Sequence, residues 1–211
     1  MGIKLKRVGK AFRRVKRPAS NYALIAVIAL IFTAGLFLQR SKMDLNYTNL
    51  LNTIAQGESR GNYNAYFGNA GNKKIDFTAM TVGEVLEWQA TYVAQGSPSS
   101  AVGKYQFINT TLKGLVDEMG VKHSERFDAD LQDRLAIRLL ERRGVQDYAH
   151  GRISREQLAH NLSKEWAALP RVIGGNPDAS YYDGDGLNKA HVKVDQVMAA
   201  ITSLKAINTK S

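Results

Sequence analysis

Twenty consecutive residues near the N-terminus, 20–39, carry no charge, and most of them are apolar (YALIAVIALIFTAGLFL over 22–38). An α-helix rises about 1.5 Å per residue, so a helix of this length spans about 30 Å, the thickness of the hydrocarbon core of a bilayer. A backbone in lipid must satisfy its own hydrogen bonds, which a helix does. The segment is therefore predicted to be a single transmembrane helix.

Two other interpretations of this segment fit it less well. A buried core helix is rarely apolar on every side over about five turns. A cleavable signal peptide has a shorter apolar stretch of about 7–15 residues followed by a small-residue cleavage site, and no clear site of that kind follows here. The segment is rich in alanine and contains Thr33 and Gly35. It is thus less hydrophobic than a Leu- and Phe-rich anchor, and slow release from the bilayer is a hypothesis that this composition permits.

The basic residues lie mainly before this segment. Of the formal net charge of +10, eight Lys and Arg side chains stand in residues 1–20, which contain no acidic residue. Cationic flanks stay on the cytoplasmic side. We therefore expect a cytoplasmic tail (1–19), a signal-anchor helix (20–39), a linker (40–47) and an exterior domain (48–208). This topology describes a single-pass protein of the inner membrane with a periplasmic domain, or its equivalent in a virion membrane.

Composition excludes several classes of site in the exterior domain. Outside the tail the net charge is only about +2, which argues against a nucleic-acid-binding domain. The chain has no cysteine, so it has no disulfide, no thiolate nucleophile and no cysteine zinc site. The four histidines form no zinc-binding motif, and no glycine-rich phosphate loop is present. We expect neither a metal nor a cofactor, and the oligomeric state is left open.

Helical patterns dominate the exterior domain. Leu50, Leu51 and Ile54 have the spacing of one helix face, and Gly57 is expected to end that helix. Residues 61–80 are rich in Gly and Asn and are predicted to form a loop with a short hairpin around 69–75. The fold class is thus α+β, mainly α.

Capping signals place the remaining helices. Two capping boxes, each a Ser or Thr followed three residues later by Glu or Gln, predict helix starts. The boxes lie at 81–84 and 154–157. Thr110 or Thr111 is expected to cap a helix that ends near Gly120, and Pro170 is expected to end the helix that starts at the second box. Two further helices are predicted, one over 128–143 and a last one from Val194.

One acidic residue stands out. Glu58 lies where an apolar helix gives way to a polar, glycine-rich loop. A carboxyl at such a junction can be half desolvated while it faces an open cleft, and desolvation raises its pKa toward the value that a general acid needs. The simpler alternative is a surface residue near a helix end, paired with Arg60.

A second polar cluster is formed by residues 100–106. Tyr105 and Gln106 are typical of sugar recognition, since a ring can stack on a sugar and an amide can hydrogen-bond to it. The alternative places Tyr105 in the core. Tyr63 and Asn64, in the polar loop after Glu58, are further candidates for substrate binding.

Four motifs in the same order resemble the phage lambda-type endolysins, which are lytic transglycosylases with a lysozyme-like fold. The resemblance covers about residues 43–205. The motifs are GES (57–59), SSAVGKYQF (99–107), LQDRLAIRLLERRG (131–144) and EWAALP (165–170). The resemblance implies that a lysozyme-like domain follows the transmembrane helix.

The resemblance also implies a function. Glu58 would be the acid/base residue that cleaves the β-1,4 bond between N-acetylmuramic acid and N-acetylglucosamine, giving a 1,6-anhydro product. Tyr105 and Gln106 match an element near the cleft, and Tyr181 or its neighbour Tyr182 would line it. Gln132, Asp133, Trp166 and Pro170 match positions that we interpret as structural. The expected partners are peptidoglycan strands and, through 20–39, the lipid bilayer.

Two alternatives stay open. A hydrolytic muramidase would act on the same bond and would need a second carboxylate, for which Asp76 and Glu84 are candidates. A non-catalytic glycan-binding or virion membrane protein would keep the cleft and cleave nothing.

Overall fold

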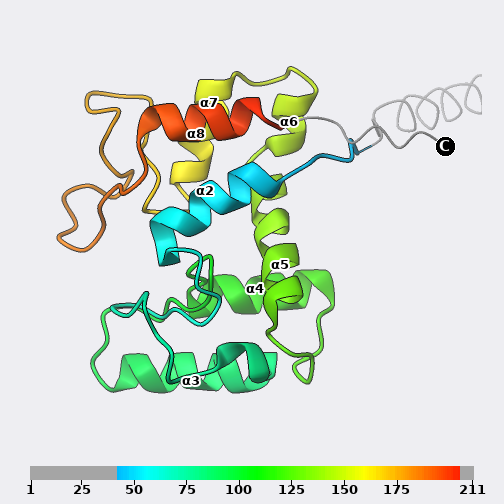
Figure 1. Ribbon diagram of the computed structural model, residues 1–211, viewed down its shortest axis with the longest axis vertical. Coiled ribbons are helices and arrows are strands. Elements are labelled where there is room, and N and C mark those ends of the chain that lie inside the picture. Colours follow the sequence, from blue (N-terminus) through cyan, green and yellow to red (C-terminus); the bar gives the residue numbers. More distant parts are fainter. Residues whose placement is uncertain (1–41, 205–211) are drawn as a thin grey trace, which may run out of the picture. The chain divides into compact units, whose positions relative to one another are not determined.

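The computed structural model describes residues 42–204, and this part of the chain is mainly helical (Figure 1). The predicted transmembrane helix at 20–39 lies outside the described residues, so it stays a prediction. Within 42–204 no helix combines the length and the apolar character that a membrane crossing requires. The elements are α2 (Thr48–Ser59), η1 (Phe77–Ala79), α3 (Val82–Ala94), α4 (Asn109–Met119), α5 (Ala129–Arg142), α6 (Val145–Ala149), α7 (Arg155–Ser163) and α8 (Val194–Thr202).

The helices form two groups with α2 between them (Figure 1). On one side α3 packs against α4, and on the other α8 packs against both α2 and α7. The long helix α5 contacts α2 and α6, and its Arg138 pairs with Glu118 of α4, so it joins the two groups. The end of α2 that carries Glu58 therefore emerges where the two groups meet.

One hydrophobic core runs through both groups. The apolar stripe expected on α2 is buried, with Leu50 and Ile54 fully enclosed, and so is the stripe Leu131, Leu135 and Leu139 on α5. Burying each such side chain contributes roughly 1.5–3 kcal/mol. The helix periodicities thus pointed to the correct core faces.

Both capping boxes begin helices as predicted. The Thr81 hydroxyl accepts a hydrogen bond from the Glu84 N–H (3.3 Å), and the Glu84 carboxylate accepts one from the Thr81 N–H (2.7 Å). Ser154 Oγ accepts from the Gln157 N–H at 3.1 Å.

Three local predictions were wrong. Helix α4 begins at Asn109 after Ile108, which provides no side-chain cap, so Thr110 and Thr111 lie inside the helix. Helix α7 ends at Ser163, before Pro170, because turns occupy the residues between. Helix α2 continues through Gly57 to Ser59.

Gly57 has a packing role instead. A Cβ atom there would lie 2.6 Å from Cγ2 of Val192 and 3.0 Å from Cβ of Ala168. A glycine therefore lets the last turn of α2 approach these two residues closely.

The β structure is smaller than expected. Only isolated bridges occur among residues 42–204, such as Tyr66 with Val102 and Val102 with Phe107. In place of a hairpin at 69–75, a loop is organised by the buried side chain of Asn72. Its Nδ2 donates to the Ile75 carbonyl at 2.8 Å, and its Oδ1 accepts from the Lys74 N–H at 3.0 Å. Side-chain hydrogen bonds of this kind compete with a strand ladder.

Candidate active site

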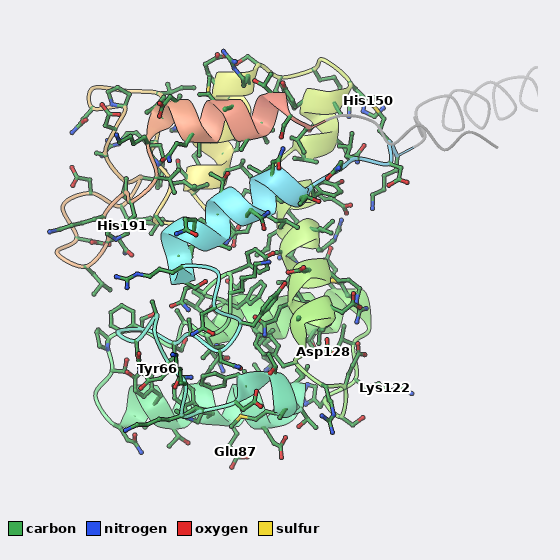
Figure 2. All side chains as sticks on the ribbon, viewed as in Figure 1. Tyr66, Glu87, Lys122, Asp128, His150 and His191 are labelled. Carbon is green, nitrogen blue, oxygen red and sulfur yellow. The ribbon has the colours of Figure 1, made fainter. Side chains whose placement is uncertain are left out.

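A cleft of about 950 Å³ opens beside the C-terminal end of α2. Its walls come from the 66–70 loop and the 98–108 segment on one side and from the 165–168 and 182–191 segments on the other. Figure 2 labels one residue from each wall, Tyr66 and His191. A cleft of this size can hold a short oligosaccharide or a ligand of similar size.

Glu58 lines this cleft and is partly buried. The Ala168 N–H donates a hydrogen bond to Glu58 Oε1 at 3.0 Å, across 110 residues of sequence. Burial raises the pKa of Glu58 from 4.5 to about 7, although the hydrogen bond from Ala168 acts in the opposite direction. Near neutral pH the carboxyl is thus present in both its protonated and ionised forms.

Hydrogen bonds of the residues that follow Glu58 fix the backbone at the end of α2. Ser59 is fully buried, and its hydroxyl donates to the Lys104 carbonyl at 2.7 Å. Arg60 then ends the helix with a left-handed backbone (φ 57°), and Gly61 N–H bonds back to the Ala55 carbonyl at 3.0 Å. No ion pair between Glu58 and Arg60 occurs among the described residues, so the simpler alternative of a surface pair is wrong.

Gln106 lines the same cleft and lies in a strained turn. Its φ of 51° is unusual for a residue other than glycine, and its side-chain amide donates to the Gly103 carbonyl at 2.9 Å. The turn is supported by Gln132 of α5, whose Oε1 accepts from the Lys104 N–H at 2.9 Å. Buried Gln132 thus has the structural role that was expected, and it holds the segment that presents Gln106.

Tyr105 does not contribute to the cleft. Only 1% of it is exposed, and its hydroxyl donates to Asp133 Oδ1 at 2.7 Å, so its ring belongs to the core. Tyr63 points to the same carboxylate at 3.0 Å and accepts a hydrogen bond from Lys104 Nζ at 2.9 Å. The prediction that Tyr105 stacks on a sugar was wrong, because Asp133 gives its hydroxyl a partner away from the cleft. Tyr63 is absent from the cleft walls for the same reason.

Two other candidates are displaced from the cleft walls. Asn64 Oδ1 accepts from the Thr78 N–H at 2.9 Å, which makes this side chain part of the loop scaffold. Tyr181 is 44% exposed and lies outside the lining, whereas Tyr182 lines the cleft and donates to the Lys164 carbonyl at 2.6 Å. The sequence predicts that one of these two consecutive tyrosines lines the cleft, and the conformation of the loop decides that it is Tyr182.

A second carboxylate, Glu165, lines the cleft and was not predicted as a site residue. Arg143 Nη2 lies 2.7 Å from its Oε2, so this carboxylate is held in an ion pair. The two candidates from the sequence, Asp76 and Glu84, lie outside the lining. Both accept local hydrogen bonds, from the hydroxyls of Thr78 and Thr81 and from nearby backbone N–H groups, and these bonds lower their pKa values.

Acid–base chemistry is what this arrangement supports. Among residues 42–204 no three His, Asp or Glu side chains are grouped closely enough to hold a metal ion. The cleft instead provides one carboxyl that titrates near neutrality, a backbone N–H at its Oε1, and an amide and a phenol on the walls. A group of this pKa can both donate and accept a proton at physiological pH.

The raised pKa of Glu58 predicts a pH dependence. If Glu58 acts first as a general acid, kcat/KM should fall about tenfold per pH unit above about 7, because the protonated fraction falls in that proportion. The profile should be measured on purified cell walls from pH 5 to 9. A profile that is flat between pH 6 and 9 would contradict a general acid with this pKa.

One family model, described as Endolysin, matches residues 48–194. No curated protein and no solved structure gives a significant match. The matched range contains the end of α2, both cleft walls and every candidate site residue.

Proposed function

The chain belongs to the endolysin family, and we propose that it is a lytic transglycosylase of peptidoglycan. Endolysins are phage enzymes that degrade peptidoglycan, and the family therefore supplies the substrate. The finer assignment is cleavage of the β-1,4 bond between N-acetylmuramic acid and N-acetylglucosamine, with Glu58 as the acid and base. The observation that carries it is a partly buried carboxyl with a pKa near 7 on the wall of a large cleft.

The reaction needs only one such carboxyl. Protonated Glu58 donates its proton to the glycosidic oxygen as the bond to the anomeric carbon breaks. The carboxylate then accepts the proton of the muramic acid 6-hydroxyl, whose oxygen attacks the anomeric carbon and closes the 1,6-anhydro ring. Glu58 ends protonated, and no water is consumed. The attack is intramolecular, so the nucleophile is already in place.

The position of Ala168 fits this role. Its N–H donates to Oε1 of Glu58 at 3.0 Å, which fixes the carboxyl group and leaves Oε2 available to the substrate. A hydrogen bond to one oxygen also stabilises the ionised form that exists between the two proton transfers.

A hydrolytic muramidase is the second candidate, and one observation favours it. Glu165 is a second carboxylate in the same cleft. An inverting hydrolase uses its second carboxylate as a base that activates water. Nε and Nη2 of Arg143 both contact Oε2 of Glu165, so this carboxylate is already engaged in an ion pair, and this supports the transglycosylase over the hydrolase.

The mass of the products separates the two reactions. Digestion of purified peptidoglycan should release muropeptides that are about 18 Da lighter than hydrolytic products, because ring closure replaces the addition of water. Mass spectrometry of the digest, with digestion by a hydrolytic muramidase as the reference, measures this directly. Products with the full hydrolytic mass would assign the muramidase reaction, and the absence of any product would favour a non-catalytic glycan-binding protein.

For localisation we propose a single-pass inner-membrane protein with a cytoplasmic N-terminus and a periplasmic domain. The support is the uncharged stretch 20–39 behind a basic tail. Such an anchor keeps the domain near its substrate and raises its effective concentration there.

Membrane fractionation tests the anchor. The full-length chain should be found in the membrane pellet after alkaline washing, whereas a variant that lacks residues 2–39 should be soluble. Recovery of the full-length chain in the soluble fraction from the earliest time points would contradict a permanent anchor. A gradual shift from the pellet to the soluble pool would support slow release of the helix.

A further inference from the structure

A second groove, of about 600 Å³, lies between α2 and α8. The two helices pack side by side, and Figure 1 shows them running past one another. Its lining combines polar side chains with small apolar ones and, apart from a histidine, carries no ionisable side chain. The lining includes Asn49, Asn52, Gln56 and Gly57 of α2, together with His191 and with Ala199 of α8.

The face of α2 that borders this groove carries three amide side chains. Asn49, Asn52 and Gln56 have the spacing of one helix face, and all three are exposed. Their side chains make no hydrogen bond to the part of the chain that the structure describes, unlike the amides of Asn62, Asn64, Asn72 and Gln132. Each unpartnered amide offers donors and an acceptor to a ligand.

The groove and the catalytic cleft meet. Gln56, Gly57 and His191 line both of them, and Glu58 is the next residue along α2. His191 is labelled in Figure 2 beside the end of this helix. The backbone here is fixed, because the N–H groups of His191 and Val192 both bond to the Ala168 carbonyl, at 2.8 and 3.1 Å. The groove is thus a side branch that joins the cleft at the catalytic carboxyl.

A branched groove suits a branched substrate. In peptidoglycan the muramic acid whose bond is cleaved carries a peptide on its lactyl group, so the substrate branches at the point of reaction. The first groups of that peptide are neutral amides, and side-chain amides pair with peptide groups by mutual donation and acceptance. A glycan that simply continued past the reaction site would follow the main cleft.

From this arrangement we propose that the groove between α2 and α8 binds the stem peptide of the muramic acid in the cleft. This inference rests on the proposed function and adds a second part of the substrate to it. Asn49 and Asn52 would hydrogen-bond to the peptide, and Gln56 would contact the substrate where the peptide leaves the glycan strand. The enzyme would therefore prefer glycan strands that still carry their peptides.

The test compares two substrates. Uncross-linked peptidoglycan strands are prepared with their stem peptides, and a portion is stripped of peptides with an N-acetylmuramoyl-L-alanine amidase. The full-length chain in detergent, its Asn49→Ala/Asn52→Ala variant and a Gln95→Ala control are assayed on both. Alanine has a higher helix propensity than asparagine, so the double variant should fold. Gln95 is an exposed amide outside both hollows.

The double variant should lose about thirtyfold in kcat/KM on peptide-bearing strands and nothing on stripped strands, since two hydrogen bonds of about 1 kcal/mol each are at stake. Ala199→Trp, which fills the groove from α8 and leaves the amides of α2 unsubstituted, should give the same selective loss. Gln95→Ala should match the parent on both substrates. Equal losses on both strands would overturn the inference and assign the groove to the glycan. No loss on either would overturn it as well.

A binding readout separates this inference from the proposed reaction. The Glu58→Gln chain should bind peptide-bearing strands more tightly than stripped ones, and the two asparagine substitutions should remove that difference. If the Glu58→Gln chain still cleaves peptidoglycan while the binding preference is present, the catalytic assignment fails and the groove stands. If cleavage is lost and no preference exists, the groove fails and the catalytic assignment stands.

Discussion

Replacing Glu58 with glutamine should reduce peptidoglycan cleavage by roughly 10²- to 10⁴-fold, the contribution of a positioned acid and base. The amide cannot supply the proton that the leaving oxygen requires, nor take one from the 6-hydroxyl. Its Oε1 can still accept the hydrogen bond of Ala168, so the geometry of the cleft should persist. Release of muropeptides, followed by chromatography, measures the loss.

The same substitution should not destabilise the fold. The pKa of Glu58 is raised in the folded protein, from 4.5 to about 7, so its contribution to stability is fully present below about pH 4.5 and is lost as the pH rises through 7. Glutamine cannot ionise. The melting temperature of the variant should therefore equal or exceed that of the parent at pH 8, and the difference should shrink at pH 5.

The matched control is Glu165→Gln, which neutralises the other carboxylate of the cleft. A transglycosylase should keep most of its activity, with a loss below about tenfold that reflects the broken ion pair with Arg143. If Glu165→Gln is as inactive as Glu58→Gln, two carboxylates are required and the muramidase reaction is favoured. Undiminished cleavage by Glu58→Gln would remove the catalytic assignment altogether.

Replacing Gly103 with alanine should destabilise the fold strongly. Gly103 has φ 82°, and a Cβ atom there would lie 2.4 Å from Oε1 of Gln132. Strain and overpacking of this kind together cost about 3 kcal/mol. Gln132 would also have to move, although its Oε1 accepts the Lys104 N–H and its Nε2 donates to the Phe127 carbonyl. For a domain of this size the melting temperature should fall by roughly 10 °C.

Gly120→Ala separates the cost of backbone strain from the cost of overpacking against Gln132. Gly120 also has a left-handed backbone (φ 64°), at the end of α4, but no atom lies within 4 Å of the position of its Cβ. It should cost only about 1 kcal/mol. Thermal unfolding followed by circular dichroism compares the two variants. Equal losses would show that the contact with Gln132 has no energetic consequence.

The candidate site was only partly predictable from the sequence. The place of Glu58 between an apolar helix and a glycine-rich loop predicts a site residue, and the structure has it on the cleft wall with Gln106. The residue type of Tyr105 predicts sugar binding, but burial decides its role, since its hydroxyl donates a hydrogen bond to Asp133, 28 residues away in sequence. Glu165 and Tyr182 lie in the irregular segments after α7, and these segments have no hydrophobic periodicity from which their position at the cleft could be predicted.

The sequence by itself determined the features that depend on neighbours within about four residues. These are the stripes of α2 and α5, the capping boxes at Thr81 and Ser154, and the uncharged stretch 20–39, whose prediction as a transmembrane helix stands on its composition. Only the tertiary structure decided which side chains share a cleft, and which carboxyl loses enough water for its pKa to rise. Both depend on contacts such as that of Glu58 with Ala168, 110 residues along the chain, because desolvation comes from whatever the whole fold packs around a group.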